Sequence, residues 1–198
     1  MGDRTAIEVR VYSCPRDQVA AVLDIVEEYR LEGGPSGGPG RPVRSDHLVL
    51  GVGYIRDEIS VGSSDDLASE LPSTAAWKVW EDPIYQLPGQ VHLHHPDLGR
   101  FVADCDAFGQ PVFTSSQVDD LMAKADGDPI VLHHHTGATW ELAFNQLDTV
   151  NNGVVLPRDL AASAPLQAVA LNQLASGPAR WLPPDAPGQT RAARGPGR

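Results

Sequence analysis

The sequence predicts an α+β protein: a ferredoxin-like βαββαβ unit followed by a small β-meander with two or three helices. Three observations predict this class. Over residues 1–82, segments with the period-2 alternation of strands alternate with segments of helical periodicity. Their order is strand, helix, strand, strand, helix, strand, which is the order of the ferredoxin-like unit. Residues 83–182 then contain short strand patterns separated by turns, together with further helical patterns.

The first strand and helix are predicted from hydrophobic spacing near the N-terminus. Ile7, Val9 and Val11 alternate with polar residues, as in a strand with one buried face. Residues 15–31 begin with a proline, which is favoured in the first helical turn, and their apolar residues then recur at helical spacing. Residues 33–46 are rich in glycine and proline, and we expect them to form a flexible loop.

Three strands and a short helix complete the first unit. Residues 47–54 are almost entirely apolar and predict a central strand, followed by a turn at 55–57 and a short strand at 58–61. A hydroxyl cap with acidic residues in the first turn predicts a helix over residues 63–71. The apolar residues 76–80 predict the last strand of the unit.

The second part, residues 83–182, is predicted to begin with the meander and to continue with helices. Thr114, with Gln117 three residues later, forms a capping box at a helix start. Residues 183–198 have the composition of a disordered tail. The other predicted elements are strands at 90–95, 100–106 and 111–113, and helices at 137–147 and 165–176.

Negative charge is concentrated in the centre of the chain. Sixteen acidic and three basic residues lie within residues 57–148, so this segment has a net charge of −13 in a chain of net charge −11. Such a field repels nucleic acid and membrane surfaces and attracts basic partners. No stretch approaches the roughly 20 apolar residues that a membrane helix needs. We therefore expect a basic protein partner, with no direct nucleic-acid binding and no membrane association.

The leading functional hypothesis is an acidic, non-enzymatic interaction protein that binds a basic, nucleic-acid-binding protein surface. Carboxylates in a stripe on one face could imitate a nucleic-acid backbone, whereas carboxylates spread over all faces would form an ordinary solvated surface. A scaffold or subunit of a larger assembly is also compatible with the sequence. The residues predicted to bind the partner are Asp57, Glu58, Asp65, Asp66, Glu81, Asp82, Asp104, Asp106, Asp119 and Asp120.

The alternative hypothesis is a metal-binding protein or a metal-dependent enzyme. His92 and His94 lie two residues apart on a predicted strand, so both point to one face. A His-x-His pair with a third imidazole can bind Zn²⁺, and His134, within the cluster 133–135, is the candidate for the third ligand. Exposed histidines without a metal are the competing interpretation, because the sequence does not show whether the clusters meet.

The two cysteines indicate where the protein is located in the cell and whether it has a reactive thiol. Cys14 and Cys105 are too few for a disulfide scaffold, and the N-terminus lacks the apolar run of a signal peptide, so we expect a cytoplasmic protein. Cys14 lies where a strand meets a helix N-terminus, a position that lowers a thiol pKa. A Cys-x-x-Cys pair would need its second thiol where Asp17 stands, so a structural role for Cys14 is favoured.

Three short motifs follow one another in the middle of the chain. They are E-D-P-x-Y at 81–85, P-x-L-G-x-F at 96–101 and C-D-A-x-G-x-P-V-F at 105–113. Together with the N-terminal strand and helix, they resemble a group of uncharacterised proteins of high-GC Gram-positive bacteria and their mobile elements. The resemblance covers roughly residues 7–120. It implies a mobile-element context, and it supplies no activity, cofactor or catalytic residue.

Overall fold

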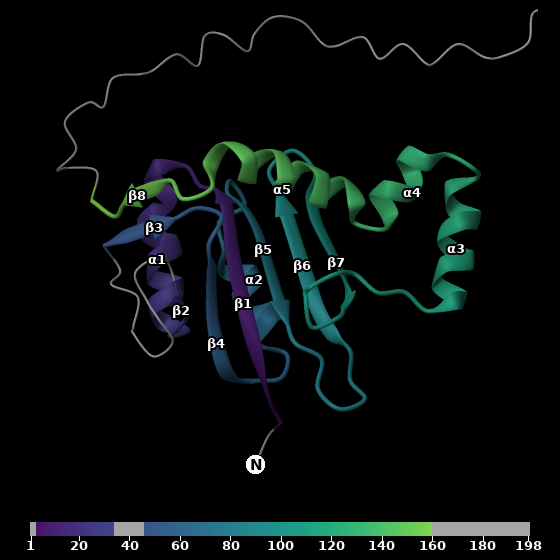
Figure 1. Ribbon diagram of the computed structural model, residues 1–198, viewed down its shortest axis with the longest axis horizontal. Helices are drawn as coiled ribbons and strands as arrows, with labels where there is room; N and C mark the ends of the chain where they lie inside the picture. Colours follow the sequence, from purple (N-terminus) through teal and green to yellow (C-terminus); the bar gives the residue numbers. More distant parts are fainter. Residues whose placement is uncertain (1–2, 34–45, 160–198) are drawn as a thin grey trace, which may run out of the picture. The chain divides into compact units, whose positions relative to one another are not determined.

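Six antiparallel strands form the largest sheet of the protein, in the order β2-β4-β1-β5-β6-β7 (Figure 1). The computed structural model describes residues 3–33 and 46–159. Its mixture of helices with a mostly antiparallel sheet confirms the predicted α+β class. The strands are β1 (Arg4–Ser13), β2 (Glu32–Gly33), β3 (His47–Val49), β4 (Gly53–Ser60), β5 (Ala76–Glu81), β6 (Gly89–His95), β7 (Gly99–Cys105) and β8 (Val155–Pro157). The helices are α1 (Val19–Glu28), α2 (Ser63–Glu70), α3 (Ser115–Ala125), α4 (Pro129–His135) and α5 (Ala138–Asn151).

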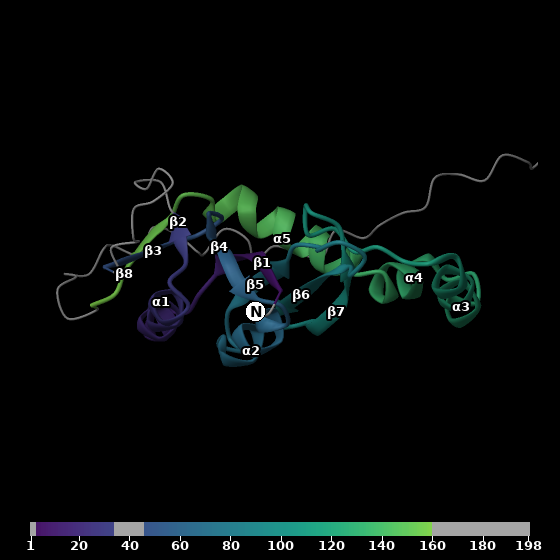
Figure 2. The same ribbon diagram turned by 90° about the horizontal axis from the view of Figure 1, so that it is seen from below.

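Each face of the sheet has its own hydrophobic core, because the side chains of a strand alternate between the two faces. On β1, Ile7 and Val9 are buried in one cluster with residues of α1 and α2. Tyr12 belongs to the other cluster, with Trp140 and Phe144 of α5. Figure 2 shows α1 and α2 on one side of the sheet and α5 on the other. We call these sides the α1/α2 face and the α5 face.

Most elements of the first unit form where the hydrophobic spacing predicts them. β1 contains the predicted strand at 7–11, and β5 contains the predicted strand at 76–80. A 3-10 turn at Arg16–Gln18 and helix α1 occupy the predicted helix at 15–31. Helix α2 occupies the predicted helix at 63–71 and buries Leu67 and Ala68 against the sheet.

The predicted central strand at 47–54 is wrong, because the chain turns in its middle. β3 leaves the main sheet and pairs with β8. Gly51 adopts a φ of +76° in the turn, and its N–H donates to the carbonyl of Val11. β4 then runs from Gly53 to Ser60 through the predicted turn at 55–57. Glycines inside an apolar run are compatible with a strand. The hydrophobic pattern therefore does not predict the left-handed conformation of Gly51.

The C-terminal part of the described structure is more helical than the sequence predicts. The predicted third meander strand at 111–113 is only an isolated bridge, between Cys105 and Pro111. Helix α4 is not predicted, yet the Asp128 side chain accepts its first free backbone N–H groups and Pro129 occupies its first turn. Helices α3 and α5 are where they are predicted, and the predicted capping box begins α3.

The boundary predicted between residues 82 and 83 lies inside the main sheet. Strand β5, before this boundary, pairs along its length with β6, after it. All described residues also belong to one compact unit, Met1–Ser163. Most of the predicted loop at 33–46, the predicted helix at 165–176 and the predicted tail at 183–198 lie outside the described residues.

Candidate functional site

The acidic residues predicted to bind a partner are distributed over several elements. Because β-strand side chains alternate, register places Asp104 on the α1/α2 face, whereas the register of β1 and β4 shifts at the level of Asp57. Four others lie on two separate helices. The placements are Asp57 and Glu58 on β4, Asp65 and Asp66 on α2, Glu81 and Asp82 at the end of β5, Asp104 and Asp106 at the end of β7, and Asp119 and Asp120 on α3. The ten carboxylates therefore do not share one face.

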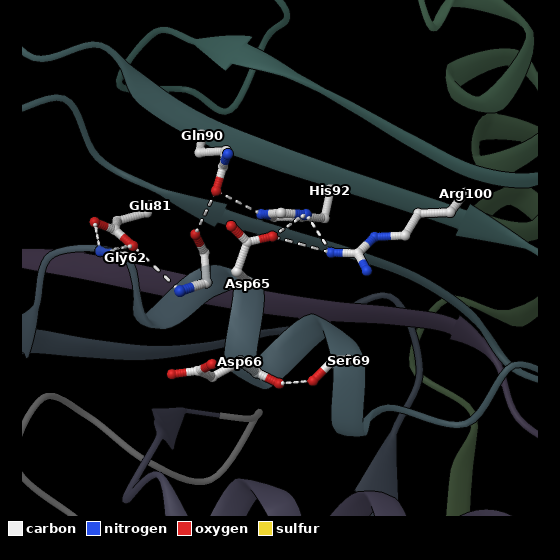
Figure 3. Close-up of polar contacts among 9 residues, drawn as sticks. Gly62, Asp65, Asp66, Ser69, Glu81, Gln90, His92 and Arg100 are labelled. Atoms are coloured by element: carbon white, nitrogen blue, oxygen red, sulfur yellow. Dashed lines mark hydrogen bonds and ion pairs between the residues drawn. The ribbon is translucent and has the colours of Figure 1, made fainter.

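Glu81 has a structural role that the sequence does not predict (Figure 3). Its side chain is buried, and one carboxylate oxygen accepts the backbone N–H of Gly62 at 2.9 Å. The other oxygen accepts the N–H groups of Gly62 at 3.1 Å and Ser64 at 3.2 Å. These N–H groups lie at the start of α2, where the first turn of a helix has no intrahelical acceptors. Glu81 therefore caps α2 and does not present its charge to a partner.

Asp82, at the end of β5, has Asp57 of β4 on one side and Asp104 and Asp106 at the end of β7 on the other, and we call these four residues the acidic end. Burial and the neighbouring Asp57 carboxylate raise the pKa of Asp82. Burial raises the pKa of the Cys105 thiol to about 12, and Asp106, Asp82 and Asp104 act on it in the same direction. No salt bridge joins any of the four to another residue that the structure describes. The acidic end thus carries four carboxylates, spread from β4 to β7, without a salt bridge to any described residue.

Asp106 also organises the turn that follows β7. Its Oδ1 accepts the backbone N–H groups of Phe108 and Gln110, both at 2.9 Å. An aspartate that accepts hydrogen bonds from the backbone two residues ahead is a common turn former. A substitution of Asp106 would therefore change the turn as well as the charge.

His92 is fixed in a polar network on the α1/α2 face (Figure 3). A guanidinium can only donate, so Arg100 Nη2, at 2.8 Å, donates to His92 Nδ1. His92 Nε2 therefore carries the proton and donates to Gln90 Oε1 at 3.0 Å. Burial and the Arg100 charge lower the pKa of His92 to about 4, so the ring is neutral at pH 7. Both ring nitrogens are engaged, which leaves no lone pair for a metal.

His94 and His134 lie on opposite sides of the sheet. His94 Nδ1 lies 3.0 Å from the carbonyl oxygen of Ala75, and its ring stacks on Trp77, a residue of the α1/α2 core. His134, on α4, packs against Trp140 on the α5 face, with ring centroids 4.6 Å apart. His92, His94 and His134 therefore do not meet in one zinc site. Among residues 3–33 and 46–159, no three His, Cys, Asp or Glu side chains are grouped to hold a metal.

Cys14 does not have the properties of an activated thiol. Burial raises its pKa to about 11, and the Asp17 carboxylate acts in the same direction. Reactive cysteines have lowered pKa values, because the thiolate is the nucleophile. The structural role favoured by the sequence is the one that this environment supports.

A polar cavity of about 410 Å³ lies on the α5 face, between the sheet, α5 and the turn after β7. Aromatic residues contribute to its wall, among them Tyr12, Trp80 and Phe108. Burial raises the pKa of the Tyr12 phenol to about 12, so its hydroxyl is neutral at pH 7 and can donate. The charged lining residues are Glu8, Arg10, Lys78, Glu141 and Asp148.

Two ion pairs lie in the wall of the cavity. Lys78, which is 4% exposed, donates to Glu141 Oε1 at 2.7 Å. Arg10 donates to Glu8 Oε1 at 2.9 Å, and burial nevertheless raises the pKa of Glu8. Both cations lie over the ring of Trp80, at 5.8 Å for Arg10 and 5.5 Å for Lys78. The cavity can therefore bind a small polar molecule, since it combines an aromatic surface with charges of both signs.

The sequence patterns do not predict this cavity, although two features of the sequence point to it. Lys78 interrupts the apolar segment AAWKVW, and a lysine in a buried strand requires a partner. Glu8 and Arg10 alternate with the core residues of β1, a strand that the sequence predicts to have only one buried face. Helix α5 packs over the face that carries Glu8 and Arg10, and the sequence of β1 alone does not show this.

Comparisons of the chain with protein-family models, with curated proteins and with solved structures found no match. Within the described ranges, no helix is long and apolar enough to cross a membrane.

Proposed function

We propose that this chain is a non-enzymatic interaction protein whose acidic end binds a basic surface of a nucleic-acid-binding protein. The observation that carries the proposal is the grouping of Asp57, Asp82, Asp104 and Asp106 without salt-bridge partners among the described residues. Burial raises the pKa of Asp82, and repulsion from the Asp57 carboxylate adds to the shift. A basic partner would relieve this repulsion, and complementary charges also accelerate encounter.

The proposed contact is a patch and not a long stripe. The acids of α2 and α3 are separate from the acidic end, so we expect Asp65, Asp66, Asp119 and Asp120 to contribute little. Nucleic-acid mimicry would then be local: four carboxylates would occupy the place of a few phosphates on the partner. The partner should release its nucleic acid when it binds this protein.

Two further properties form part of the proposal. We infer a ferredoxin-like arrangement for β1 to β5, supported by β1 lying antiparallel between β4 and β5 and by α2 connecting those two strands. The hairpin of β6 and β7 would extend that unit. We also place the protein in the cytoplasm, in the mobile-element context that the sequence resemblance implies.

The test compares two variants that change the charge equally. Asp57, Asp82 and Asp104 are replaced by Asn in one variant, and Asp66, Asp119 and Asp120 in the other. Each purified protein is immobilised, incubated with lysate of the source organism at low and high salt, and its bound proteins are identified by mass spectrometry. Salt weakens contacts between exposed charges, so the partner should elute at high salt.

We expect a nucleic-acid-binding protein that the second variant retains and the first variant loses. The purified partner should then release a labelled DNA or RNA fragment when the wild-type protein is added. Equal binding to both triple variants would refute a role for the acidic end. Retention of the partner at high salt would refute its electrostatic basis.

A further inference from the structure

We propose that the cavity on the α5 face binds a small zwitterion of the amino-acid type, with its carboxylate at Arg10 and Lys78 and its ammonium at Asp148. This ligand site is independent of the acidic end and of a protein partner. It follows from two cations that lie opposite each other on neighbouring strands, from Asp148, which forms no salt bridge with any described residue, and from the aromatic surface of the same cavity.

The carboxylate end is defined by Arg10 and Lys78. They lie directly opposite each other in the register of β1 and β5 and share the α5 face. Like charges in directly opposed positions destabilise a sheet. Glu8 and Glu141 offset part of this cost, but Arg10 Nε is buried and has no hydrogen-bond partner among the described residues. A ligand carboxylate beside the two cations would accept from a guanidinium N–H of Arg10 that Glu8 does not use and from a further N–H of Lys78.

The ammonium end is defined by Asp148, one of the three carboxylates of the lining. Two cations face three carboxylates, so a purely anionic ligand would meet a wall of net negative charge. Asp148 is the carboxylate without a cation: its Oδ2 accepts only from the Asn152 amide, and its buried Oδ1 has no partner within the part of the chain that the structure describes. A ligand ammonium would pair with Asp148 at Oδ2, while the carboxylate of the same zwitterion meets the two cations, so the net charge of the site does not change.

The aromatic residues provide the surface for the rest of the ligand. Trp80 forms part of the cavity wall under the two cations, and Tyr12, the next residue of β1 on this face after Arg10, carries a neutral hydroxyl. Phe108 lines the cavity yet is 79% exposed, as expected for a residue at the mouth that a ligand could cover. A cavity of about 410 Å³ is within the usual range for small organic ligands, roughly 300–1,000 Å³. An amino acid with a large apolar side chain therefore fits this composition.

The first experiment uses the wild-type full-length chain, so it does not depend on how any variant folds. Each common amino acid is added at millimolar concentration, and thermal unfolding identifies those that raise the melting temperature. Calorimetry then compares a bound amino acid with two analogues, the amine that lacks its carboxylate and the acid that lacks its ammonium. We expect Kd for each analogue to be about tenfold weaker or worse. Absence of binding by every amino acid, or equal affinity for either analogue, would overturn the proposal.

Substitutions then locate the site. Arg10→Gln and Asp148→Asn should each weaken binding at least about tenfold, because each removes one end of the recognition. Phe108→Ala, at an exposed position, should leave the fold intact and weaken binding severalfold. The triple variant of Asp57, Asp82 and Asp104 should bind the amino acid as the wild type does. Full affinity in Arg10→Gln and Asp148→Asn would place the ligand elsewhere and refute this site, whatever the outcome for the protein partner.

Discussion

The carboxylate of Glu81 accepts the backbone N–H of Gly62 at 2.9 Å and thereby fixes the start of α2 to the end of β5. Replacement by Ala leaves the N–H groups of Gly62 and Ser64 without this acceptor in a buried place. We expect Glu81→Ala to lower the free energy of unfolding by about 1–3 kcal/mol. Glu81→Gln should lose less, since an amide oxygen still accepts one of these hydrogen bonds. Urea denaturation measures both changes.

The matched control for Glu81 is Glu58→Ala on β4. Glu58 has an exposed side chain and a 3.7 Å contact with the exposed Arg4, so its removal should cost less than about 1 kcal/mol. Equal losses for Glu58→Ala and Glu81→Ala would contradict the capping role. They would show that the loss follows from net charge and not from the hydrogen bonds at α2.

The second prediction is that acid destabilises the folded protein through His92. The pKa of His92 is about 4 in the folded protein and 6.5 as its ordinary value, so below pH 6.5 the unfolded chain takes up a proton that the folded chain rejects. Stability should therefore fall as the pH decreases from about 6.5 to about 4, by about 3 kcal/mol over the whole window. The measurement is the free energy of unfolding against pH, for the wild type and for His92→Gln.

The difference between wild type and His92→Gln should be constant above about pH 7 and should change only in that window. Arg100→Gln is the companion variant, because it removes the charge that helps to lower the pKa of His92. Its pH dependence should be shallower than that of the wild type. An unchanged pH profile in His92→Gln would assign the acid sensitivity to other groups.

The sequence predicted those parts of the fold that depend on local spacing. The alternation of Ile7, Val9 and Val11 and the capping box of Thr114 and Gln117 are each contained in a few consecutive residues. The separation of β3 from β4 depends on a left-handed backbone at Gly51 that faces Val11 and α5. Such a turn is stabilised by contacts with distant segments, so spacing alone does not predict it.

The candidate sites were less accessible to prediction than the fold, because they combine residues from distant segments. Lys78 and Glu141 are 63 residues apart in the chain and become an ion pair only when α5 packs on the sheet. The sequence predicts that Glu81 lies on the surface. In the structure it is buried against α2 and caps that helix. The spacing of His92 and His94 correctly placed them on one face, and only the tertiary structure shows what their nitrogens bind.

The third prediction concerns the pair of Lys78 and Glu141. Lys78 is almost fully buried, whereas the side chain of Glu141 is 26% exposed. Glu141→Gln leaves a buried ammonium without its carboxylate and should cost about 2–3 kcal/mol, somewhat below the range for fully buried pairs. Lys78→Met should cost less, because Met fills a similar volume and Glu141 can turn to water. Thermal or urea unfolding of both variants gives the comparison, and a larger loss for Lys78→Met would contradict the interpretation of Lys78 as the buried partner.

The fourth prediction concerns Gly109, whose close approach to Trp80 shapes the wall of the cavity. Gly109 has a φ of +66°, and a Cβ added there would lie 2.7 Å from the Trp80 ring. Gly109→Ala therefore adds a steric clash to the cost of a left-handed backbone, and we expect a loss of about 2–4 kcal/mol in unfolding free energy. Gly127→Ala is the control, because Gly127 has a φ of +78° and no heavy atom within 4 Å of the added Cβ. It should lose only about 1–2 kcal/mol, the backbone cost. Equal losses in the two variants would mean that Trp80 moves aside freely, and the indole fluorescence of Gly109→Ala would then report a displaced Trp80.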